Sequence, residues 1–432
     1  MTLLLSRRFG PLFAAQFLGA FNDNLYKNAL VLLVLFHGLG HVEASGVVVN
    51  LAAGVFILPF FVLSASAGEW ADRADKACIA RFTKTLEVAI VALGGAGLVT
   101  GSLPLAMVAL ALLGVHSALF GPVKYGVLPQ HLHAEELLVG NAWIEAATFL
   151  AILLGTLLAG VLVNSTDAAL QVTVVSLFAA LAGRLAVQWM PAAPPSAPIS
   201  KLSDIDWQPL RATRRVLRWA RAEPVWPVLL AISWFWAFGA TVLTQLPVLV
   251  RDHLHGDAGV VSVLLAVFSV GVGAGSLLVS ALLRRRPDAS VVPLAALAMA
   301  LSAGLWLVVV HLVAGDFATA PDRVMLVQDW LLQPWTPAVL LSLAALAVAG
   351  GAYCVPLYTA LQRLAPLDRR GQAVAANNIV NSAAMVMAAA IGAVALAGGV
   401  GVVALLGAVA ALNLPVALWA RRLPPQAKPD QV

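Results

Sequence analysis

Long apolar segments recur along the whole chain, and they constrain its fold more than any other feature. Each has the roughly 20 mostly apolar residues that a helix needs to cross a bilayer. Because lipid cannot satisfy backbone polar groups, a spanning segment of this kind forms a helix. The sequence predicts twelve of them, at residues 9–36, 45–67, 80–100, 104–128, 139–163, 168–190, 225–250, 259–283, 291–314, 337–363, 372–396 and 399–420.

The composition agrees with an all-α polytopic membrane protein. The chain is 61% hydrophobic and 11% charged, whereas a soluble domain carries roughly 25% charged residues. Its cysteines, Cys78 and Cys354, lie far apart and predict no disulfide framework. The first apolar segment is too long for a signal-peptide core, so we expect it to be a retained span.

Basic residues gather in alternate loops. The opposite set of loops has only Arg251 and Arg323 as basic residues, beside several aspartates. The positive-inside rule therefore predicts that both termini are cytoplasmic. The net charge is +5. Because the basic residues lie in the loops that set the membrane topology, we expect no nucleic-acid partner. The basic loops contain Arg7, Arg8, Arg73, Lys76, Arg81, Lys84, the segment 191–224, Arg284 to Arg286, Arg363, Arg369, Arg370, Arg421 and Arg422.

A linker at residues 191–224 divides the predicted spans into two groups of six. It separates an N-terminal six-helix bundle, residues 1–190, from a C-terminal one, residues 225–432. The linker begins with a stiff proline-rich run and continues as a basic stretch with interleaved tryptophans. This stretch is either an amphipathic helix on anionic lipid headgroups or a solvated connection.

The two halves show faint internal similarity. Asn141 and Glu145 are spaced as Asn377 and Asn381 are, one helical turn apart. Two groups of six spans with such repeats resemble the major facilitator superfamily. Residues 68–76 resemble that superfamily's signature Gly-x-x-x-Asp-Arg-x-Gly-Arg, although Asp75 stands where the signature has its second glycine.

The signature predicts a cytoplasmic gate formed by Gly68, Asp72, Arg73 and Lys76. Gly68 allows close helix approach. Asp72 can cap the positive N-terminal end of the span at 372–396 and pair with a basic side chain when that side is closed. The alternative is a charged loop that only sets topology.

A carboxylate lies at the centre of the first span. Placing Asp23 at mid-bilayer costs roughly 2.5–3.5 kcal/mol, so membrane carboxylates face a protein interior or a water-filled path. Lys27 lies one turn along the same helix face. We expect the pair to keep Asp23 ionised, which makes it a ligand-binding group rather than a proton carrier.

In the superfamily, the first, fourth, seventh and tenth spans line a central cavity. The resemblance therefore implies a substrate-binding set that includes polar residues from these spans and their neighbours. Its members are Asn22, Asp23, Asn24, Lys27, Lys124, Tyr125, Glu145, Gln245 and Tyr358. Glu145 either pairs with Lys124 or titrates. We expect Asn141, Asn377, Asn378 and Asn381 to form hydrogen bonds between helices. Neither a metal nor a cofactor is expected.

Several longer motifs carry a closer resemblance. Residues 9–30, 121–132, 140–146, 233–236 and 375–381 resemble bacterial lysophospholipid transporters of the superfamily. They look most like the transporter module that some bacteria fuse to an acyltransferase and an acyl-carrier-protein synthetase.

The resemblance implies transport of lysophosphatidylethanolamine and lysophosphatidylglycerol across the bacterial inner membrane. The lipids would move toward the cytoplasmic leaflet for reacylation, by rocking of the two halves. We expect a monomer among membrane lipids, with the acyltransferase and acyl-carrier-protein synthetase as separate partners.

Three alternatives remain open at this point. The fold equally suits ion-coupled solute uptake or drug efflux. A scramblase would move the same lipids without direction. An enzyme is the third alternative, because His311 and Asp316 match the His-x4-Asp pattern of glycerolipid acyltransferases. They lie at the predicted periplasmic end of a span, away from any acyl donor, so we expect no catalysis.

Overall fold

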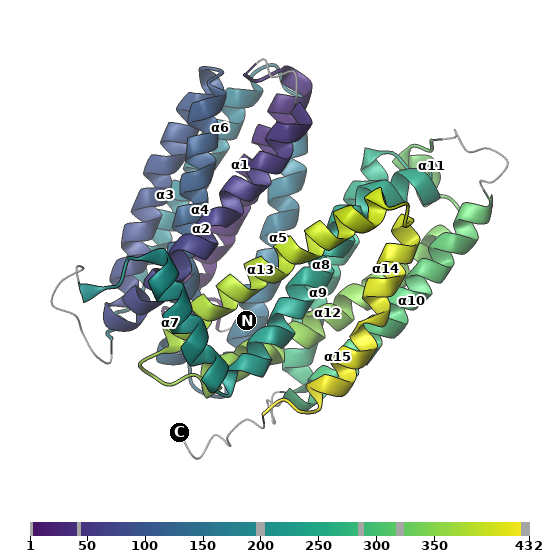
Figure 1. Ribbon diagram of the computed structural model, residues 1–432. Helices are drawn as coiled ribbons and strands as arrows, with labels where there is room; N and C mark the ends of the chain where they lie inside the picture. The colour runs from purple at the N-terminus through teal and green to yellow at the C-terminus, as the bar shows by residue number, and fades with distance from the viewer. Residues whose placement is uncertain (1–2, 41–44, 196–203, 284–288, 317–323, 425–432) are drawn as a thin grey trace. The chain divides into compact units, whose positions relative to one another are not determined.

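The computed structural model describes residues 3–40, 45–195, 204–283, 289–316 and 324–424, and every regular element among them is a helix (Figure 1). Arg284 to Arg286 and Arg323, on which part of the predicted orientation rests, lie outside the described residues, as does part of the linker.

Twelve membrane spans account for most of the described chain. Eleven helical segments are long and apolar enough to cross a membrane, and the first long helix, with its polar centre, completes the twelve. The N-terminal helices are α1 (Gly10–His37), α2 (Ser45–Arg73), α3 (Lys76–Val99), α4 (Leu103–His131), α5 (Leu137–Val163), α6 (Ala168–Ala186) and α7 (Pro209–Ala222). The later helices are α8 (Val225–His253), α9 (Ala258–Leu282), α10 (Val292–Asp316), α11 (Val327–Leu331), α12 (Thr336–Leu364), α13 (Arg370–Ala397), α14 (Val402–Ala411) and α15 (Asn413–Ala420).

Local signals fix several helix ends. Asp75 precedes α3 in an extended conformation, and its carboxylate accepts hydrogen bonds from the backbone N–H groups of Ala77 and Cys78. Asp75 is therefore an ordinary N-cap, which explains why this chain needs no glycine at that position. At the other end of α1, Gly38 adopts a left-handed φ of 63° and its N–H bonds to the Leu33 carbonyl.

The predicted span at residues 399–420 is confirmed as a membrane span at Val402–Ala420. The span is divided into α14 and α15 at Leu412. Asn413 is fully buried at this junction, where its amide donates to the Ala410 carbonyl and accepts from the Trp234 indole. A side-chain amide that bonds to nearby backbone competes with the regular helix ladder, which accounts for the break.

The chain forms two compact units. Unit 1 contains Met1–Trp226 and Leu361–Ile379, and unit 2 contains Pro227–Ala360 and Val380–Val432. The C-terminal end of α12 and the N-terminal end of α13 therefore belong to unit 1, with the first seven helices.

Unit 1 buries a continuous apolar core between its helices. α1 packs on α5 and α6, α2 packs on α4, and α3 packs on α4 and α6. Leu30, Ile90 and Leu110 lie in this core, and the Tyr26 hydroxyl satisfies the Ala106 carbonyl within it. In unit 2, α10 packs on α14 and α15.

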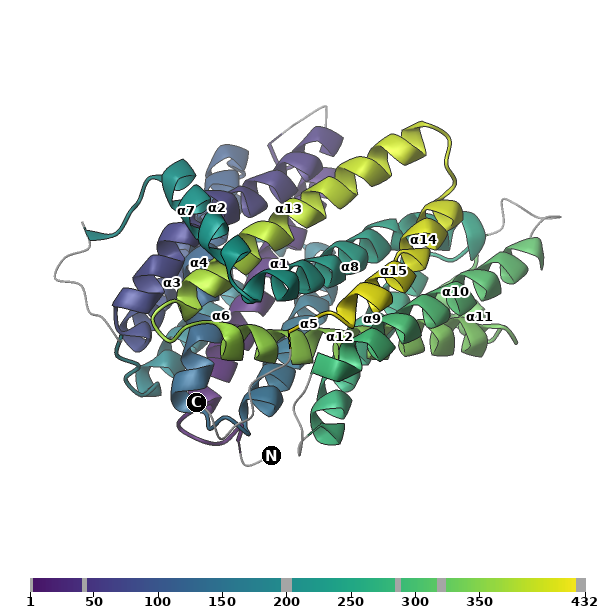
Figure 2. The same ribbon diagram turned by 60° about the horizontal axis from the view of Figure 1, so that its bottom comes forward.

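The basic part of the linker forms α7, which lies beside α2 in both views (Figures 1 and 2). Ala212, Val216 and Ala220 form its buried face, while Arg214 and Arg218 are exposed. The small inner residues allow α7 to pack closely against α2. A role for the outer face on lipid headgroups stays a prediction.

Candidate functional site

A polar cavity of about 160 Å³ lies inside unit 1. Apolar side chains surround it in the core, but its own wall carries both signs of charge. Its polar lining comes from α1, α3, α4 and the first turns of α13, and consists of Gln16, Asp23, Lys84, His116, Ser117, Lys124, Tyr125 and Asn378. We call this space the polar cavity.

Asp23 lies on the wall of the polar cavity and is 9% exposed. One carboxylate oxygen accepts a 2.5 Å hydrogen bond from the Ser117 hydroxyl, while its buried Oδ1 has no hydrogen-bond partner among the described residues. The described part of the chain shows no ion pair between Asp23 and Lys27, and the expectation that Lys27 keeps Asp23 ionised stays a prediction. The Lys27 ammonium instead donates to Asn24 Oδ1 at 3.3 Å and lies 5.7 Å from the Phe56 ring centroid.

Lys84 lines the polar cavity, although we predicted it to be a topology-setting cation of a loop. It is fully buried in α3, and its ammonium donates to Glu87 Oε2 at 2.7 Å. Asn22 donates to the other oxygen of Glu87, and His116 Nε2 lies 3.5 Å from Glu87 Oε2. Two opposite charges three residues apart inside a predicted span were the signal that could have revealed this pair.

Lys124, Tyr125 and Glu145 lie together on α4 and α5. The Tyr125 hydroxyl donates to Glu145 Oε1 at 2.5 Å, and the Lys124 ammonium lies 4.4 Å from the Tyr125 ring centroid. Glu145 is 1% exposed, and it lies behind Tyr125 rather than on the cavity wall. Tyr125 therefore connects a buried carboxylate to the polar cavity.

The predicted interhelical asparagines have different environments. Asn141 exchanges two hydrogen bonds with the Gln362 amide, at 2.7 and 3.1 Å. Asn378 lines the polar cavity, whereas neither polar atom of the fully buried Asn377 has a hydrogen-bond partner among the described residues. In unit 2, Asn381 accepts a 2.7 Å hydrogen bond from Ser233.

Two residues of the predicted substrate-binding set belong to unit 2. The Tyr358 hydroxyl accepts a hydrogen bond from the Trp236 indole at 3.0 Å. Gln245 has a buried carbonyl oxygen without a hydrogen-bond partner among the described residues. His311 is exposed on α10 in the same unit, and the side chain of Asp316 lies outside the described residues.

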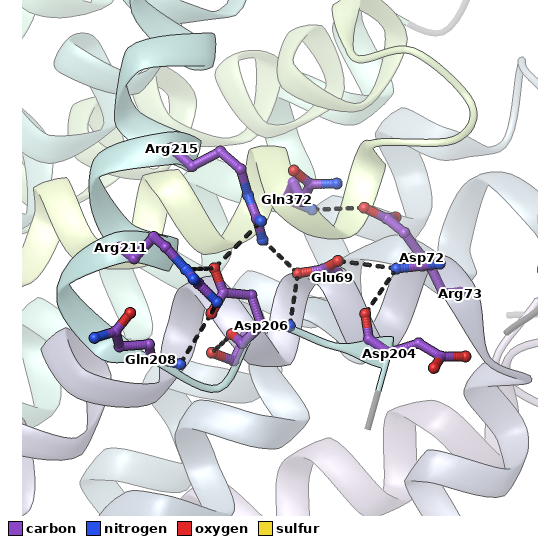
Figure 3. Close-up of polar contacts among 10 residues, drawn as sticks. Glu69, Asp72, Arg73, Asp204, Asp206, Gln208, Arg211, Arg215 and Gln372 are labelled. Atoms are coloured by element: carbon purple, nitrogen blue, oxygen red, sulfur yellow. Dashed lines mark hydrogen bonds and ion pairs between the residues drawn. The ribbon is translucent and has the colours of Figure 1, made fainter. Parts of the chain in front are cut away.

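A second polar site joins α2 to the beginning of α13 (Figure 3). The two oxygens of Asp72 accept hydrogen bonds from the backbone N–H groups of Gly371 and Gln372, at 2.6 and 2.9 Å. A carboxylate at this position stabilises the positive end of the helix. The backbones approach closely, since a Cβ at Gly68 would lie 2.7 Å from the Gly371 carbonyl oxygen. We call this the α2–α13 contact.

The other charged residues of the motif have different partners. Arg73 donates to Glu69 on its own helix and to the Asp204 carbonyl, at 3.0 and 3.2 Å. Lys76 is 4% exposed at the start of α3, near Gly126 of α4. Asp72 is thus held by backbone N–H groups.

Two carboxylates and two arginines connect α7 to α2 (Figure 3). Arg215 forms ion pairs with both Glu69 and Asp206. Arg211 donates two hydrogen bonds to Asp206 in a bidentate ion pair, both at 2.8 Å. Hydrogen bonds from Arg211, together with a backbone N–H and the nearby arginine charges, hold the pKa of the Asp206 carboxyl at about 2. We call these four residues the α7 cluster.

No group of three or more His, Cys, Asp or Glu side chains within the described residues is arranged to hold a metal ion. The charged and hydrogen-bonding groups on the wall of the polar cavity can recognise a ligand by charge and hydrogen bonding.

Comparison with known proteins defines the class. The profile of the Major Facilitator Superfamily matches residues 12–328, and the chain belongs to that superfamily. A bacterial homologue of the iron transporter ferroportin, in an outward-facing state, has a TM-score of 0.67 at 16% identity, covering 95% of this chain and 99% of its own. The human organic anion transporter MFSD10 has a TM-score of 0.69 at 13% identity, covering 94% and 99%. At these identities the likeness shows the fold alone.

Curated relatives narrow the resemblance. The lysophospholipid transporter LplT of Pectobacterium carotovorum is 28% identical over 398 residues, which cover 89% of this chain and 86% of the relative. The lysophospholipid transporter LplT of Escherichia coli strain SE11 is 28% identical over 396 residues, covering 89% and 88%. The chain is thus a membrane transporter by superfamily, with lysophospholipid transporters among its relatives.

Proposed function

We propose that this protein transports lysophospholipids across the bacterial inner membrane, toward the cytoplasmic leaflet. The observation that carries the proposal is the polar cavity inside an apolar bundle, where Asp23 and the Lys124 ammonium share a wall. One oxygen of Asp23 has no hydrogen-bond partner within the described part of the chain. A zwitterionic headgroup has both matching charges. The names of the curated relatives support the same substrate class.

In this proposal each charge of the headgroup has a protein partner. The free oxygen of Asp23 accepts the ammonium of lysophosphatidylethanolamine, and Lys124 attracts its phosphate. A cavity of about 160 Å³ is smaller than the roughly 300–1,000 Å³ of pockets that enclose whole ligands. It therefore receives the headgroup, while the single acyl chain extends along apolar helix surfaces.

Alternating access supplies the movement. The two bundles, residues 1–190 and 225–432, rock about the substrate, and the 191–224 linker connects them on the cytoplasmic side with both termini. The α2–α13 contact acts as the cytoplasmic gate, closed when Asp72 caps α13. The protein works as a monomer and delivers lysolipids to a separate acyltransferase and acyl-carrier-protein synthetase.

The test is transport by purified protein in proteoliposomes. Radiolabelled lysophosphatidylethanolamine and lysophosphatidylglycerol are offered outside, with and without imposed proton or sodium gradients, and protein-free liposomes serve as the control. We expect directional uptake of both lipids, and Asp23→Ala at equal reconstitution should abolish uptake of lysophosphatidylethanolamine.

Uptake no faster than in protein-free liposomes would overturn the proposal. Competition by common drugs but not by lysolipids would identify a drug exporter instead, and equilibration without net accumulation in every gradient would identify a scramblase.

A further inference from the structure

The Lys84 ammonium is unusually under-coordinated for a buried charge. Its side chain has no exposed surface, and Glu87 Oε2, at 2.7 Å, is its one hydrogen-bond acceptor among the described residues. An ammonium carries three donors, so two of them have no acceptor in the described part of the protein. One side of the group is covered by the Phe120 ring, whose centroid lies 4.9 Å away.

The ammonium reaches the wall of the polar cavity because residue 19 is glycine. A Cβ at Gly19 would lie 2.4 Å from Lys84 Nζ, so any larger residue would displace the ammonium. Gly19, Ala20 and Lys84 all line the cavity. Gly19 and Ala20 of α1 thus leave room for the long side chain of Lys84 from α3.

Glu87 holds Lys84 in this extended position. The Glu87 carboxylate is itself fixed by the Asn22 amide at 3.2 Å, and His116 lies 3.5 Å from the oxygen that accepts from Lys84. All three side chains are at most 2% exposed. Taking both charges of an ion pair out of water carries a desolvation penalty that their mutual attraction must first offset. A contribution to folding stability alone therefore does not explain why this ion pair is buried at the edge of a polar cavity.

We propose that Lys84 is a second phosphate-binding group of the polar cavity, beside Lys124, and that it recognises the phosphodiester that lysophosphatidylethanolamine and lysophosphatidylglycerol share. The inference rests on the proposed function and deepens it. The phosphate oxygens complete the coordination that Glu87 leaves unfilled, and Asn22 and Glu87 act as positioning residues for the ammonium. Asp23 binds the headgroup amine, which varies between substrates, whereas Lys84 binds the phosphate, which both substrates share.

The test measures discrimination between ligands with and without phosphate. Purified full-length protein is titrated with lysophosphatidylethanolamine, with lysophosphatidylglycerol and with monoacylglycerol of the same chain length. Inorganic phosphate and glycerophosphoethanolamine serve as soluble competitors, which separates a free anion from a lipid headgroup. We expect the wild type to prefer both lysolipids to monoacylglycerol.

Variants are chosen to separate recognition from folding. Lys84→Gln should weaken binding of both lysolipids at least tenfold and leave monoacylglycerol binding within twofold. Lys84→Met combined with Glu87→Leu removes both charges and leaves no unpaired ion. It should lose the same discrimination while remaining folded. Arg81→Gln removes a positive charge from the same helix at a partly exposed position and should retain wild-type discrimination.

The outcomes are distinguishable. Wild-type preference for lysolipids that persists in the double variant would overturn the role of Lys84 and leave the proposed function intact. An equal loss of monoacylglycerol and lysolipid binding in both variants would show that Lys84 is structural, and would also overturn the proposal. A wild type that binds no lysolipid would overturn the proposed function, and this site with it.

Discussion

The polar cavity and the charged sites at the end of α2 belong to the same unit, but their charged groups differ in how fully they are paired. Both oxygens of Asp72 are satisfied by backbone N–H groups, and Glu69 and Asp206 have arginine partners. In the cavity, Asp23 has an oxygen without a hydrogen-bond partner and Lys84 has one acceptor, counted over the residues that the structure describes. Buried polar groups normally find partners. Groups that lack them at a cavity wall are candidates for ligand binding, whereas satisfied groups hold helices together.

The largest effect should come from Asp23→Asn, which tests the cavity side of the comparison. Losing a hydrogen bond to a charged group costs about 1.5–3 kcal/mol, so lysophosphatidylethanolamine should bind roughly 10–100-fold more weakly. Lysophosphatidylglycerol, which has no amine, should lose far less. Thermal unfolding should be unchanged or shifted upward, because the variant removes a half-satisfied buried charge. Equal losses for both lipids would contradict the role of Asp23.

Gly68→Ala tests whether the α2–α13 contact depends on close approach. The added methyl group would lie 2.6 Å from the Ala375 Cβ, and overpacking typically costs about 1–3 kcal/mol. Transport should slow strongly while binding of lysolipid persists. Gly54→Ala on the same helix is the matched control, since a Cβ there meets no atom within 4 Å. Equal transport by the two variants would show that the contact is dispensable.

Asp72→Asn tests the charge at the same contact without changing its shape. A carboxylate at a helix N-terminus contributes about 0.3–1 kcal/mol, and up to ~2 kcal/mol when partly buried. We expect a lower unfolding temperature and slower transport, with lysolipid affinity within twofold of the wild type. This pattern is the reverse of that expected for Asp23→Asn. A large loss of affinity would place Asp72 in substrate binding instead.

The Glu69–Arg215 pair should have a small effect, which a double-mutant cycle can measure. The Arg215 side chain is 49% exposed, and exposed ion pairs contribute about 0.2–1 kcal/mol. The coupling between Glu69→Gln and Arg215→Gln in unfolding experiments should fall in this range and shrink at high salt. A coupling that salt does not change would indicate that the pair is more protected than its exposure suggests.

The smallest effect is the pH dependence of the α7 cluster. The pKa of Asp206 is about 2 in the folded protein, below its ordinary value of 3.8. Its contribution is therefore present above about pH 4 and is lost as the pH falls toward 2. A spin label at residue 214, in a Cys78→Ser background, should become more mobile over this window. The same label in Asp206→Asn should show no such transition, and identical curves would exclude Asp206 as the cause.

The sequence predicted the helices well because their cause is local. A run of about 20 apolar residues in lipid satisfies its backbone only as a helix. The sequence did not predict the local break of the last span at residue 412, beside the buried Asn413. It also did not predict the burial of Lys84, because a positive charge near a span end suits a topology signal as well as a buried ion pair. The burial of Lys84 depends on Gly19 of α1 and Phe120 of α4.

The sequence by itself determined that this chain is a helical membrane protein with two six-span halves, since hydrophobic length and charge placement act residue by residue. It also singled out Asp23 as a costly charge and residues 68–76 as a superfamily motif. Only the tertiary structure decided which charges meet. It placed Asp23 beside Ser117 rather than in an ion pair with Lys27, and it placed Lys84 beside Glu87. The contact of Asp72 with the start of α13, in contrast, was already predicted from the motif. Partner choice depends on how helices pack, and packing brings together residues that are distant in sequence.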